Sequence, residues 1–379
     1  MFDGTAERIE FDDDRIRLHL RDLQVLFERP LQQSPYLGTG GSEGDAGLKG
    51  RPKPLCYGRC FHVPAVLVDA ATLTYQVHDG QISGIDAVFD SGLALTSGTE
   101  PPAPSHYAVD LAAGTFRLGS APDGPVTAHV HGDAAGGAYA EDAASLMLRI
   151  AMRASGLSLI DWGAFASLTL AAPMAAGFFA SQETGMLSAL DDLADSIGAH
   201  FGFNRQGLFT VGRLTEPLET ATESFDDSAI VSLEREPSAL PIWRQKLGYA
   251  RYWRPLSDGE SATGLGAEAR SDLTASHRYA DASDPAIQIR HKLAGDIQKD
   301  GLLATEPDAA TEAARRLALF GTARDLFRVR VKTRPYSLTL GSTIRITYPR
   351  HGLAGGRNLV LAGLSEDSAF DEAELTLWG

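Results

Sequence analysis

Cysteine is nearly absent from this sequence of 379 residues, which contains only Cys56 and Cys60. Two thiolates fall short of the four that an iron–sulfur cluster normally uses, and of the four ligands of a structural zinc site. In the extended stretch that they share, four residues at about 3.3 Å each place them roughly 13 Å apart. We therefore expect no intrachain disulfide between them.

Long apolar runs are also missing. The longest, Leu168 to Ala180, is shorter than the roughly 20 residues of a membrane span and contains Pro173. The opening MFDGTAERIEFDDD has no cationic region followed by an apolar run. The sequence therefore predicts neither a transmembrane segment nor a secretory signal peptide.

Positive charge is scarce as well. Lys and Arg number 34 against 49 Asp and Glu, a formal charge of −15. This balance argues against a protein that reads nucleic-acid sequence, because such proteins present a basic surface to phosphates. With 44% hydrophobic and 22% charged residues, the composition is that of a soluble globular protein, and the length favours two or three domains.

A phosphate-binding signature is missing too. The Gly-rich segment 38–50 fails as a phosphate loop, because Leu48 separates Gly47 from Lys49 and because Glu43 and Asp45 would repel phosphate. We interpret it as a flexible surface or assembly loop.

Two histidines, His129 and His131, alternate beside Asp133 as metal ligands on one strand can do. Two ligands do not make a site, so solvent-facing strand histidines are the favoured interpretation. Glu234 and Glu236 could imitate a glycosidase pair, but a solvated strand face explains them better. We expect a protein that is not an enzyme and assign no catalytic, cofactor or metal residue; metal binding by Cys56, Cys60, His129 or His131 stays open.

The first 135 residues read as a β-rich domain. Arg15 to Arg21 alternate between apolar and charged side chains, which predicts a half-buried strand. Residues 37–54 form a long Gly-rich loop that we expect to be partly mobile and to gain order against a partner. Tyr75 to His78, followed by the turn Asp79-Gly80 and by Ile82, predict a hairpin.

Between residues 136 and 215, the spacing of apolar residues changes to that of helices. Apolar residues at helical spacing predict a helix over 143–154 and another over 187–197, and a hairpin around Gln206-Gly207. Strand patterns return over 216–379, where we expect a low-order stretch at 256–275 and one helix near 307–322. One face of this helix is predicted to carry Ala310, Ala313, Ala314, Leu317 and Gly321. Strands are predicted at 328–332, 343–348 and 375–377. The predicted domains are thus 1–135, 136–215 and 216–379.

Several short sequence motifs occur in order along the chain. They cover residues 48–54 with 57–59, 67–69, 75–80 with 88–90, 177–179 with 190–194, 338–349 and 375–379. Together they resemble the hub proteins of tailed-phage baseplates and tail tips, which also occur in prophages and gene transfer agents. The resemblance implies a mainly β fold with an α+β insert and two small tail-tube-like β-barrels per subunit. It also implies a homotrimer whose six barrels form a ring, a structural part of the virion made in the host bacterial cytoplasm.

The implied ring adapts the hexameric tail tube, or a distal tail protein, to a central tip, spike or fibre with three-fold symmetry. Tape-measure protein and genomic DNA would pass through its channel without sequence-specific binding. The negative charge, for example at 12–14 and 366–367, would then keep DNA from adhering to the wall. Some related minor tail proteins hold an iron–sulfur cluster with four cysteines, which is not transferred to this chain.

Two other classes stay open at this point. One is a metal-dependent or cell-wall hydrolase built on His129 and His131. The other is a β module that binds a host receptor or a glycan.

Overall fold

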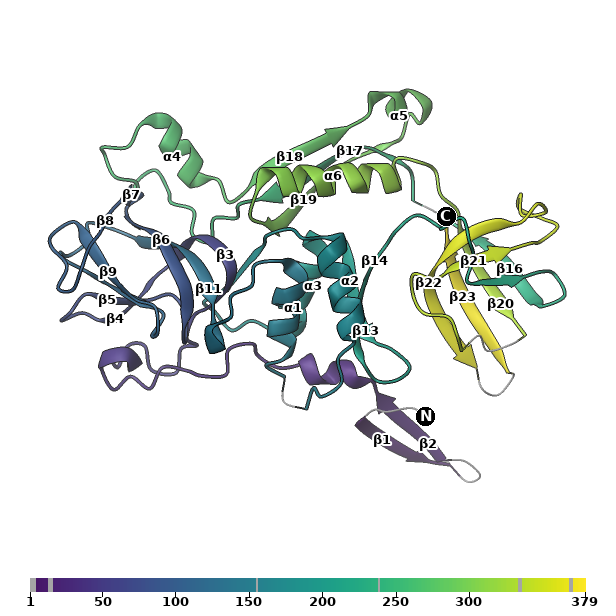
Figure 1. Ribbon diagram of the computed structural model, residues 1–379, viewed down its shortest axis with the longest axis horizontal. Coiled ribbons are helices and arrows are strands. Elements are labelled where there is room, and N and C mark those ends of the chain that lie inside the picture. The colour runs from purple at the N-terminus through teal and green to yellow at the C-terminus, as the bar shows by residue number, and fades with distance from the viewer. Residues whose placement is uncertain (1–4, 13–15, 155, 238, 333–335, 368–370) are drawn as a thin grey trace.

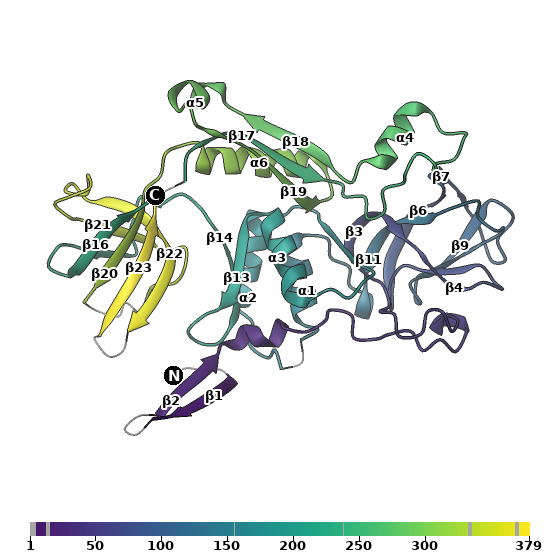
Figure 2. The ribbon, with the colours of Figure 1, turned by 180° about the vertical axis from the view of Figure 1, so that it is seen from behind.

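The computed structural model describes residues 5–12, 16–154, 156–237, 239–332, 336–367 and 371–379. The fold is a strand-rich mixture of helices and strands, with 39% strand and 19% helix, several sheets and one half-barrel. Figures 1 and 2 show the arrangement: two sheets at one end, a helical centre crossed by a smaller sheet, the half-barrel at the other end, and an N-terminal hairpin standing off the body. No helix in the described ranges is long and apolar enough to cross a membrane.

Two five-stranded sheets built mostly from residues 55–133 share one apolar core. The first has the order β4-β5-β10-β9-β8, with β4 Val66–Asp69, β5 Thr74–Gln76, β10 Thr115–Leu118, β9 His106–Asp110 and β8 Thr96–Ser97. The second has the order β12-β3-β11-β6-β7, with β12 Gly177–Ala180, β3 Leu55–Pro64, β11 Val126–Asp133, β6 Ile82–Asp90 and β7 Leu93–Ala94. Strand β12 comes from the following region, so the helical centre is tied to this core through the sheet.

The hairpin predicted around Asp79-Gly80 is wrong. Strands β5 and β6 flank this turn but belong to different sheets. The backbone amides of Val77 and His78 donate to the carbonyl of Gly114, which guides the chain from one sheet to the other. A turn signal identifies a reversal, but it does not identify the strand that becomes the partner.

The helical centre contains both predicted helices and one that the sequence did not reveal. Its elements are α1 Ala143–Ala151, α2 Trp162–Ala171, α3 Met186–Ser196, β13 Ala199–Phe203 and β14 Phe209–Arg213. Helices α1 and α3 bury the predicted apolar residues, and β13 pairs with β14 as the predicted hairpin. Helix α2 is new, and the carboxylate of Asp161 caps it by accepting from the amide of Ala164.

A three-stranded sheet crosses above this centre, with β17 Ile242–Tyr249 between β18 Arg278–Ser283 and β19 Gly295–Leu303. Helix α6 Glu306–Phe320 packs along it and confirms the helix expected near 307–322. The stretch expected to have low order contains α4 Ala267–Thr274, because Leu273 packs with Tyr252 and Leu256 in a small core of its own. A further helix, α5 Pro285–Arg290, follows β18.

The half-barrel is one six-stranded sheet of order β15-β21-β22-β23-β20-β16. Its strands are β15 Glu223–Phe225, β16 Ile230–Glu236, β20 Leu326–Val331, β21 Thr343–Ile346, β22 Arg357–Asp367 and β23 Glu372–Trp378. Val329 and Val331 point into its core while Arg328 and Arg330 face outward, which confirms the predicted alternation. The sequence between 242 and 320 therefore leaves this sheet and builds the separate one described above.

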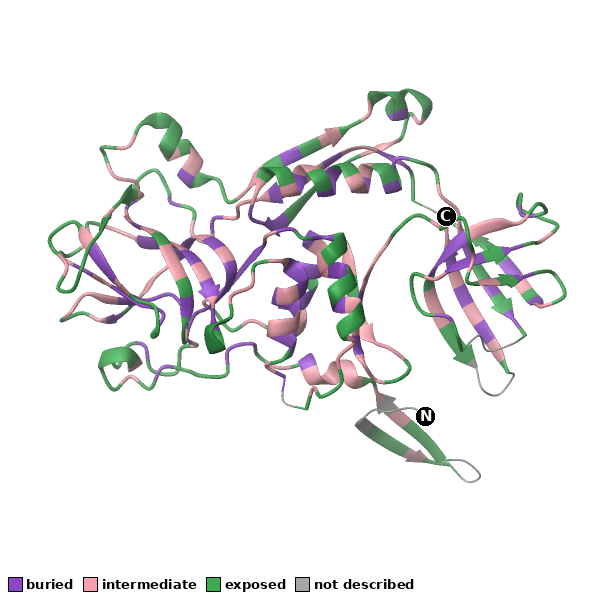
Figure 3. Cartoon of the chain, in the orientation of Figure 1, coloured by how far each residue is buried: buried purple, intermediate pink, exposed green. Residues whose placement is uncertain are grey.

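The N-terminal strand predicted to be half-buried is instead exposed on its apolar face. Strand β2 Ile16–Arg21 pairs with β1 Thr5–Phe11, and the short 3-10 helix Leu23–Phe27 connects this hairpin to the body. Ile16 and Leu18 are 71% and 49% exposed. Figure 3 shows the hairpin largely in the colour of exposed residues. Apolar and charged side chains alternate along β2 as predicted, but the described part of the chain does not cover the apolar face.

The Gly-rich segment 37–54, expected to be a partly mobile loop, makes several contacts of its own. The amide of Gly38 donates to the carbonyl of Glu43, and that of Gly40 to Gly44. The Glu43 carboxylate accepts from the amide of Leu37 and pairs with Lys53 at 2.6 Å. Leu48 is buried against Tyr36 and Val68 in a small core. The segment needs no partner for these contacts, and it contains the short 3-10 helix Gly41–Glu43.

A buried charge cluster joins α6 to the helical centre. Glu312 is fully buried and pairs with Arg213, with Arg315 at 2.7 Å and with Arg316 at 2.7 Å. Burial raises the pKa of the Glu312 carboxyl, but the hydrogen bonds from Arg315 and Arg316 outweigh it, so the pKa is lowered overall. Arg213 also donates to the carbonyl of Ile197 at the end of α3. The buried face of α6 is therefore rotated from the predicted one: Ala314 is exposed, whereas Glu312 and Arg316 are buried.

Replacing Glu312 by Gln is expected to lower the free energy of unfolding by about 3–5 kcal/mol, because it leaves buried guanidinium groups without a counter-charge. Urea denaturation followed by tryptophan fluorescence measures the change. The control is Glu268→Gln on the exposed side of α4, which should stay within about 0.5 kcal/mol of the unmodified protein. A loss below about 1 kcal/mol for Glu312→Gln would show that the cluster does not join these elements.

Candidate functional site

The paired histidines of β11 lie in different surroundings. The ring of His129 is half-buried, with ring centroids at 5.3 Å from Phe61 and 4.7 Å from Phe89. His131 instead makes a 2.9 Å contact from Nε2 to Asp86 and a 3.0 Å contact from Nδ1 to the hydroxyl of Tyr139. A register shift in β11 lies between His129 and Val130. The expectation that both histidines face solvent is thus wrong for His129, which packs against aromatic rings.

No metal centre forms around these residues. Within the described ranges, no group of three or more His, Cys, Asp or Glu side chains lies close enough to hold a metal ion. Asp133, which lies beside the two histidines in the sequence, pairs with Arg149 and lies 3.6 Å from Nε2 of His78. Its carboxylate therefore has structural partners in the segment between β5 and β6 and on α1.

The two cysteines are buried free thiols on β3, with exposures of 0% and 1%. Gly58 lies between them with φ of +63°, and a Cβ there would come within 2.2 Å of the carbonyl of Ala176 on the neighbouring strand. The left-handed backbone at Gly58 makes β3 irregular between the cysteines, so the separation calculated from sequence for a regular strand does not apply. Burial raises the pKa of the Cys56 thiol, and the hydrogen-bonded thiol of Cys60 raises it further.

We expect Cys56 and Cys60 to resist alkylation in the folded protein, because a buried thiol with a raised pKa offers little thiolate. Mass spectrometry after treatment with N-ethylmaleimide at pH 7.5 should find no added label in native protein and two labels after denaturation. Rapid labelling of the native chain would show that β3 opens to solvent.

His62 lies where β3 and β11 contact the segment after β17, a contact that the sequence did not predict. It is 3% exposed on β3, and its ring lies 4.5 Å from His129 and 4.3 Å from Tyr252, which belongs to the segment after β17. Nδ1 of His62 contacts the hydroxyl of Thr127 at 3.0 Å. Burial lowers the pKa of His62 to about 3 and that of His129 to about 4, each helped by nearby positive charge. A single histidine in a strand gives no sequence signal for such packing.

The protein should lose stability in acid through these two histidines. Their pKa values are about 6.5 in the unfolded chain but lower in the folded one, so below pH 6.5 the unfolded state binds more protons. The free energy of unfolding should fall by up to about 1.4 kcal/mol per pH unit for each histidine between pH 6.5 and pH 4. Urea denaturation at several pH values measures this slope.

His129→Phe should reduce the slope, because it removes one of the two titrating rings. A phenyl ring preserves the packing, and Nε2 of His129 is buried without a hydrogen-bond partner among the described residues. The control is His351→Asn: His351 is exposed with φ of +58°, a backbone conformation that Asn tolerates. An unchanged slope in His129→Phe would mean that His129 does not titrate with folding.

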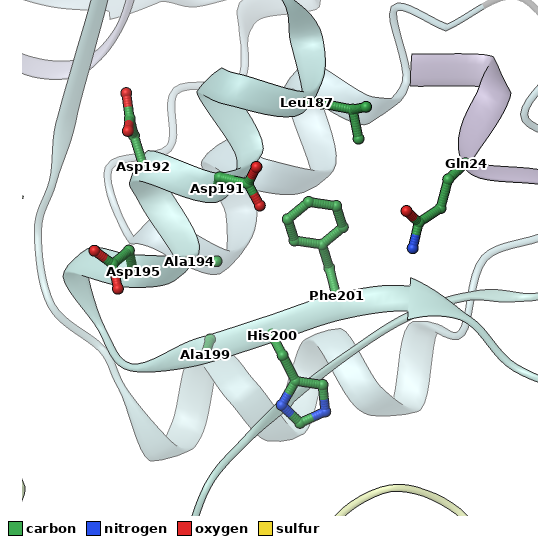
Figure 4. Close-up of a pocket in the computed structure, with 9 residues that line it drawn as sticks. All are labelled: Gln24, Leu187, Asp191, Asp192, Ala194, Asp195, Ala199, His200 and Phe201. Carbon is green, nitrogen blue, oxygen red and sulfur yellow. The ribbon is translucent and has the colours of Figure 1, made fainter. Parts of the chain in front are cut away.

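A depression of about 510 Å³ lies between α3 and β13. Figure 4 shows Asp191, Asp192 and Asp195 pointing in three different directions, with Phe201 at the centre. Asp195 forms an ion pair with Lys299. Burial raises the pKa of Asp191 and of Asp192, helped by the neighbouring carboxylates. Because the three carboxylates diverge, they are not arranged to share a proton or a cation.

A larger groove of about 750 Å³ separates the β13–β14 hairpin from the half-barrel. Arg205, in the turn of the hairpin, reaches across it to Glu366 at 2.6 Å and lies 5.7 Å from the ring centroid of Tyr336. On the near wall, Asp161 caps α2 and accepts from the hydroxyl of Thr210 at 3.2 Å. These polar side chains connect structural elements. Glu366 is thus paired, while Asp13 and Asp14, also expected to contribute to an acidic channel wall, lie outside the described residues.

The outer face of α2, formed by Trp162, Ala166 and Leu170, is an exposed apolar surface. These residues recur every four positions and so lie on one side of the helix. Trp162 and Leu170 are 59% and 83% exposed, whereas Phe165 and Leu168 pack into the core. A helix that is apolar all round is normally covered on every side. The outer face of α2 is therefore the candidate contact surface of this chain.

No family model matches the chain, and no curated protein gives a significant match. Among solved structures, it is similar to a chain in the virion of a native gene transfer agent particle: identity 14%, coverage 87% of this chain and 84% of that one, TM-score 0.49. The tail protein from Neisseria meningitidis MC58 has 12% identity and a TM-score of 0.38, with coverage of 88% and 94%. The 43 kDa tail protein of prophage MuSo2 from Shewanella oneidensis has 11% identity and a TM-score of 0.36, with coverage of 86% of this chain and 93% of that one. At these scores the likeness assigns neither family nor function.

Proposed function

We propose that this protein is a structural component of a phage-type tail, located in the virion at the tail tip or baseplate. It acts as a hub: three copies form a ring that adapts the six-fold tail tube to a three-fold central tip and lets DNA pass. The observation that carries the assembly role is the exposed apolar outer face of α2. On this face the side chains of Trp162 and Leu170 are in contact with water. The tail assignment rests on the sequence motifs that resemble hub proteins.

The ring would be built from two strand-rich bodies per subunit. One is the half-barrel; the other is the pair of five-stranded sheets that share a core, which we propose as the counterpart of the second small tail-tube-like barrel. Three copies then present six such bodies around one axis. This number fits the six-fold tube on one side, while the three-fold repeat of the whole chain fits the tip on the other.

The proposed partners follow from that position. A tail-tube or distal tail protein contacts one side of the ring, and a tip, spike or fibre protein contacts the other. Tape-measure protein and genomic DNA pass along the axis without sequence-specific contacts. The formal charge of −15 suits such passage, because basic side chains on the wall would bind phosphates and slow the DNA.

The oligomeric state tests the hub role. Native mass spectrometry of the full chain should find a species of three times the chain mass of 40.4 kDa, with a population that rises with concentration. Immunogold labelling of particles from the parent element should place the protein at one end of the tail. Labelling of the head, or absence of the protein from purified particles, would contradict the tail assignment.

Charge on the outer face of α2 should block assembly. The variant Trp162→Asp with Leu170→Asp removes apolar surface that we propose to be covered in the tail, without touching the core residues of α2. In a strain that lacks the wild-type gene, we expect it to lower the yield of complete particles at least about tenfold. Leu111→Asp, at an exposed turn with 43% exposure, is the matched control and should support normal yields. Equal yields from both variants would show that the outer face of α2 stays in solvent.

A further inference from the structure

The N-terminal hairpin separates apolar and charged side chains onto opposite faces. On one face Ile9 pairs with Leu18 and Phe11 pairs with Ile16, and Phe11 is 77% exposed. The other face is held by Glu10, which forms ion pairs with Arg8, with Arg17 at 3.5 Å and with His19 at 3.3 Å. Glu10 is thus paired within the hairpin, while the apolar face is left in water.

A two-stranded hairpin of this kind is at best marginally stable in water, and a third strand or a covering apolar surface is normally required. Figures 1 and 2 show β1 and β2 away from the sheets of the body, joined to it through the 3-10 helix Leu23–Phe27. Within the described residues, β1 and β2 hydrogen-bond only each other as a sheet, so each has one open edge. Open, apolar strand edges are sites of pairing with another chain.

The charges of the two strands favour another copy of the same hairpin as that chain. Strand β1 carries two acidic residues and one basic one, whereas β2 carries two arginines, a histidine and no acidic residue. Placing β2 of one copy beside β1 of the next therefore sets basic side chains against acidic ones. The two strands would also run antiparallel across this contact, as they do within the hairpin.

We propose that the β1–β2 hairpins of three copies of this chain pair edge to edge into a closed six-stranded stem. Closure satisfies all open edges, encloses Ile9, Phe11, Ile16 and Leu18 of every copy, and leaves the Glu10 ion pairs in solvent. The number of copies rests on the proposed three-fold hub; the pairing itself rests on the hairpin's faces and edges.

Such a stem lies on the three-fold axis of the ring. Its interior is filled by apolar side chains, so it closes the axis instead of forming a pore. Passage of DNA then requires the hairpins to separate. They can do so without unfolding the body, because the contacts that hold the stem are those between hairpins.

The test compares three full-length proteins by native mass spectrometry over a range of concentrations. The hairpin variant carries Phe11→Asp and Ile16→Asp. The matched control carries Ile289→Asp and Leu293→Asp, two side chains of similar size and exposure at the tip of α5, far from the hairpin. Both pairs are exposed in the single chain, so at concentrations where all three proteins are monomeric, thermal unfolding should show the same midpoint.

We expect the wild-type and control proteins to form trimers and the hairpin variant to need at least tenfold higher concentration for the same trimer population. A hairpin variant that forms trimers as readily as the wild type would overturn the stem but leave the ring intact. A wild-type chain that stays monomeric at every concentration would contradict both the stem and the ring.

Cross-linking gives an independent readout. In a Phe11→Cys variant, the added thiols of three copies would meet inside the stem, while Cys56 and Cys60 stay buried. A short bismaleimide should therefore yield covalently linked chains from this variant and not from an Ile289→Cys control. Equal linkage in the two variants would contradict the stem.

Discussion

The arrangement of this protein depends on one buried carboxylate. Glu312 neutralises guanidinium groups from its own helix and from Arg213, and so fixes α6 against β14 and the end of α3. The position matters because β14 is the last strand before the chain first enters the half-barrel, and α6 is the last helix before the chain returns to it. The two connections by which the chain enters the half-barrel thus begin in elements that the cluster joins. The half-barrel has an apolar core of its own, and Arg205 pairs with Glu366 between the helical centre and the half-barrel.

Interaction surfaces are found outside these cores. The body packs apolar residues in separate clusters, whereas α2 and the N-terminal hairpin each expose an apolar face. They differ in kind: the face of α2 is part of a rigid, packed helix, and the hairpin stands on a short connector. A rigid surface suits a fixed neighbour in an assembly, and a protruding hairpin suits contact between copies around an axis.

Periodicity predicted the parts whose burial is decided locally. The apolar spacing of α1 and α3 and the alternation around Val329 report directly which face meets a core. Periodicity failed to predict the buried face where the residue that determines it is distant in sequence. Helix α2 has apolar residues on every side and so shows no helical period, and the buried face of α6 is set by Arg213, about a hundred residues earlier.

The same limit applies to the sites. The Asp79-Gly80 turn was visible, but the carbonyl of Gly114 determines where the chain goes next. The spacing of His129 and His131 is compatible with a metal site, yet the two side chains have separate neighbours, with a register shift between His129 and Val130. His62, which stands alone in the sequence, packs against the ring of His129 instead. The hairpin's amphipathic pattern was read correctly, while the absence of cover by the same chain depends on the whole fold.

The central claim is that three copies of this chain form a ring in a phage-type tail. Electron cryomicroscopy of isolated tails from the parent element tests it most directly. We predict density for three copies, placed between a six-fold tube and a three-fold tip, with the half-barrels and the paired five-stranded sheets alternating around the axis. Density that places the chain elsewhere, or in a number of copies other than three, would contradict the account.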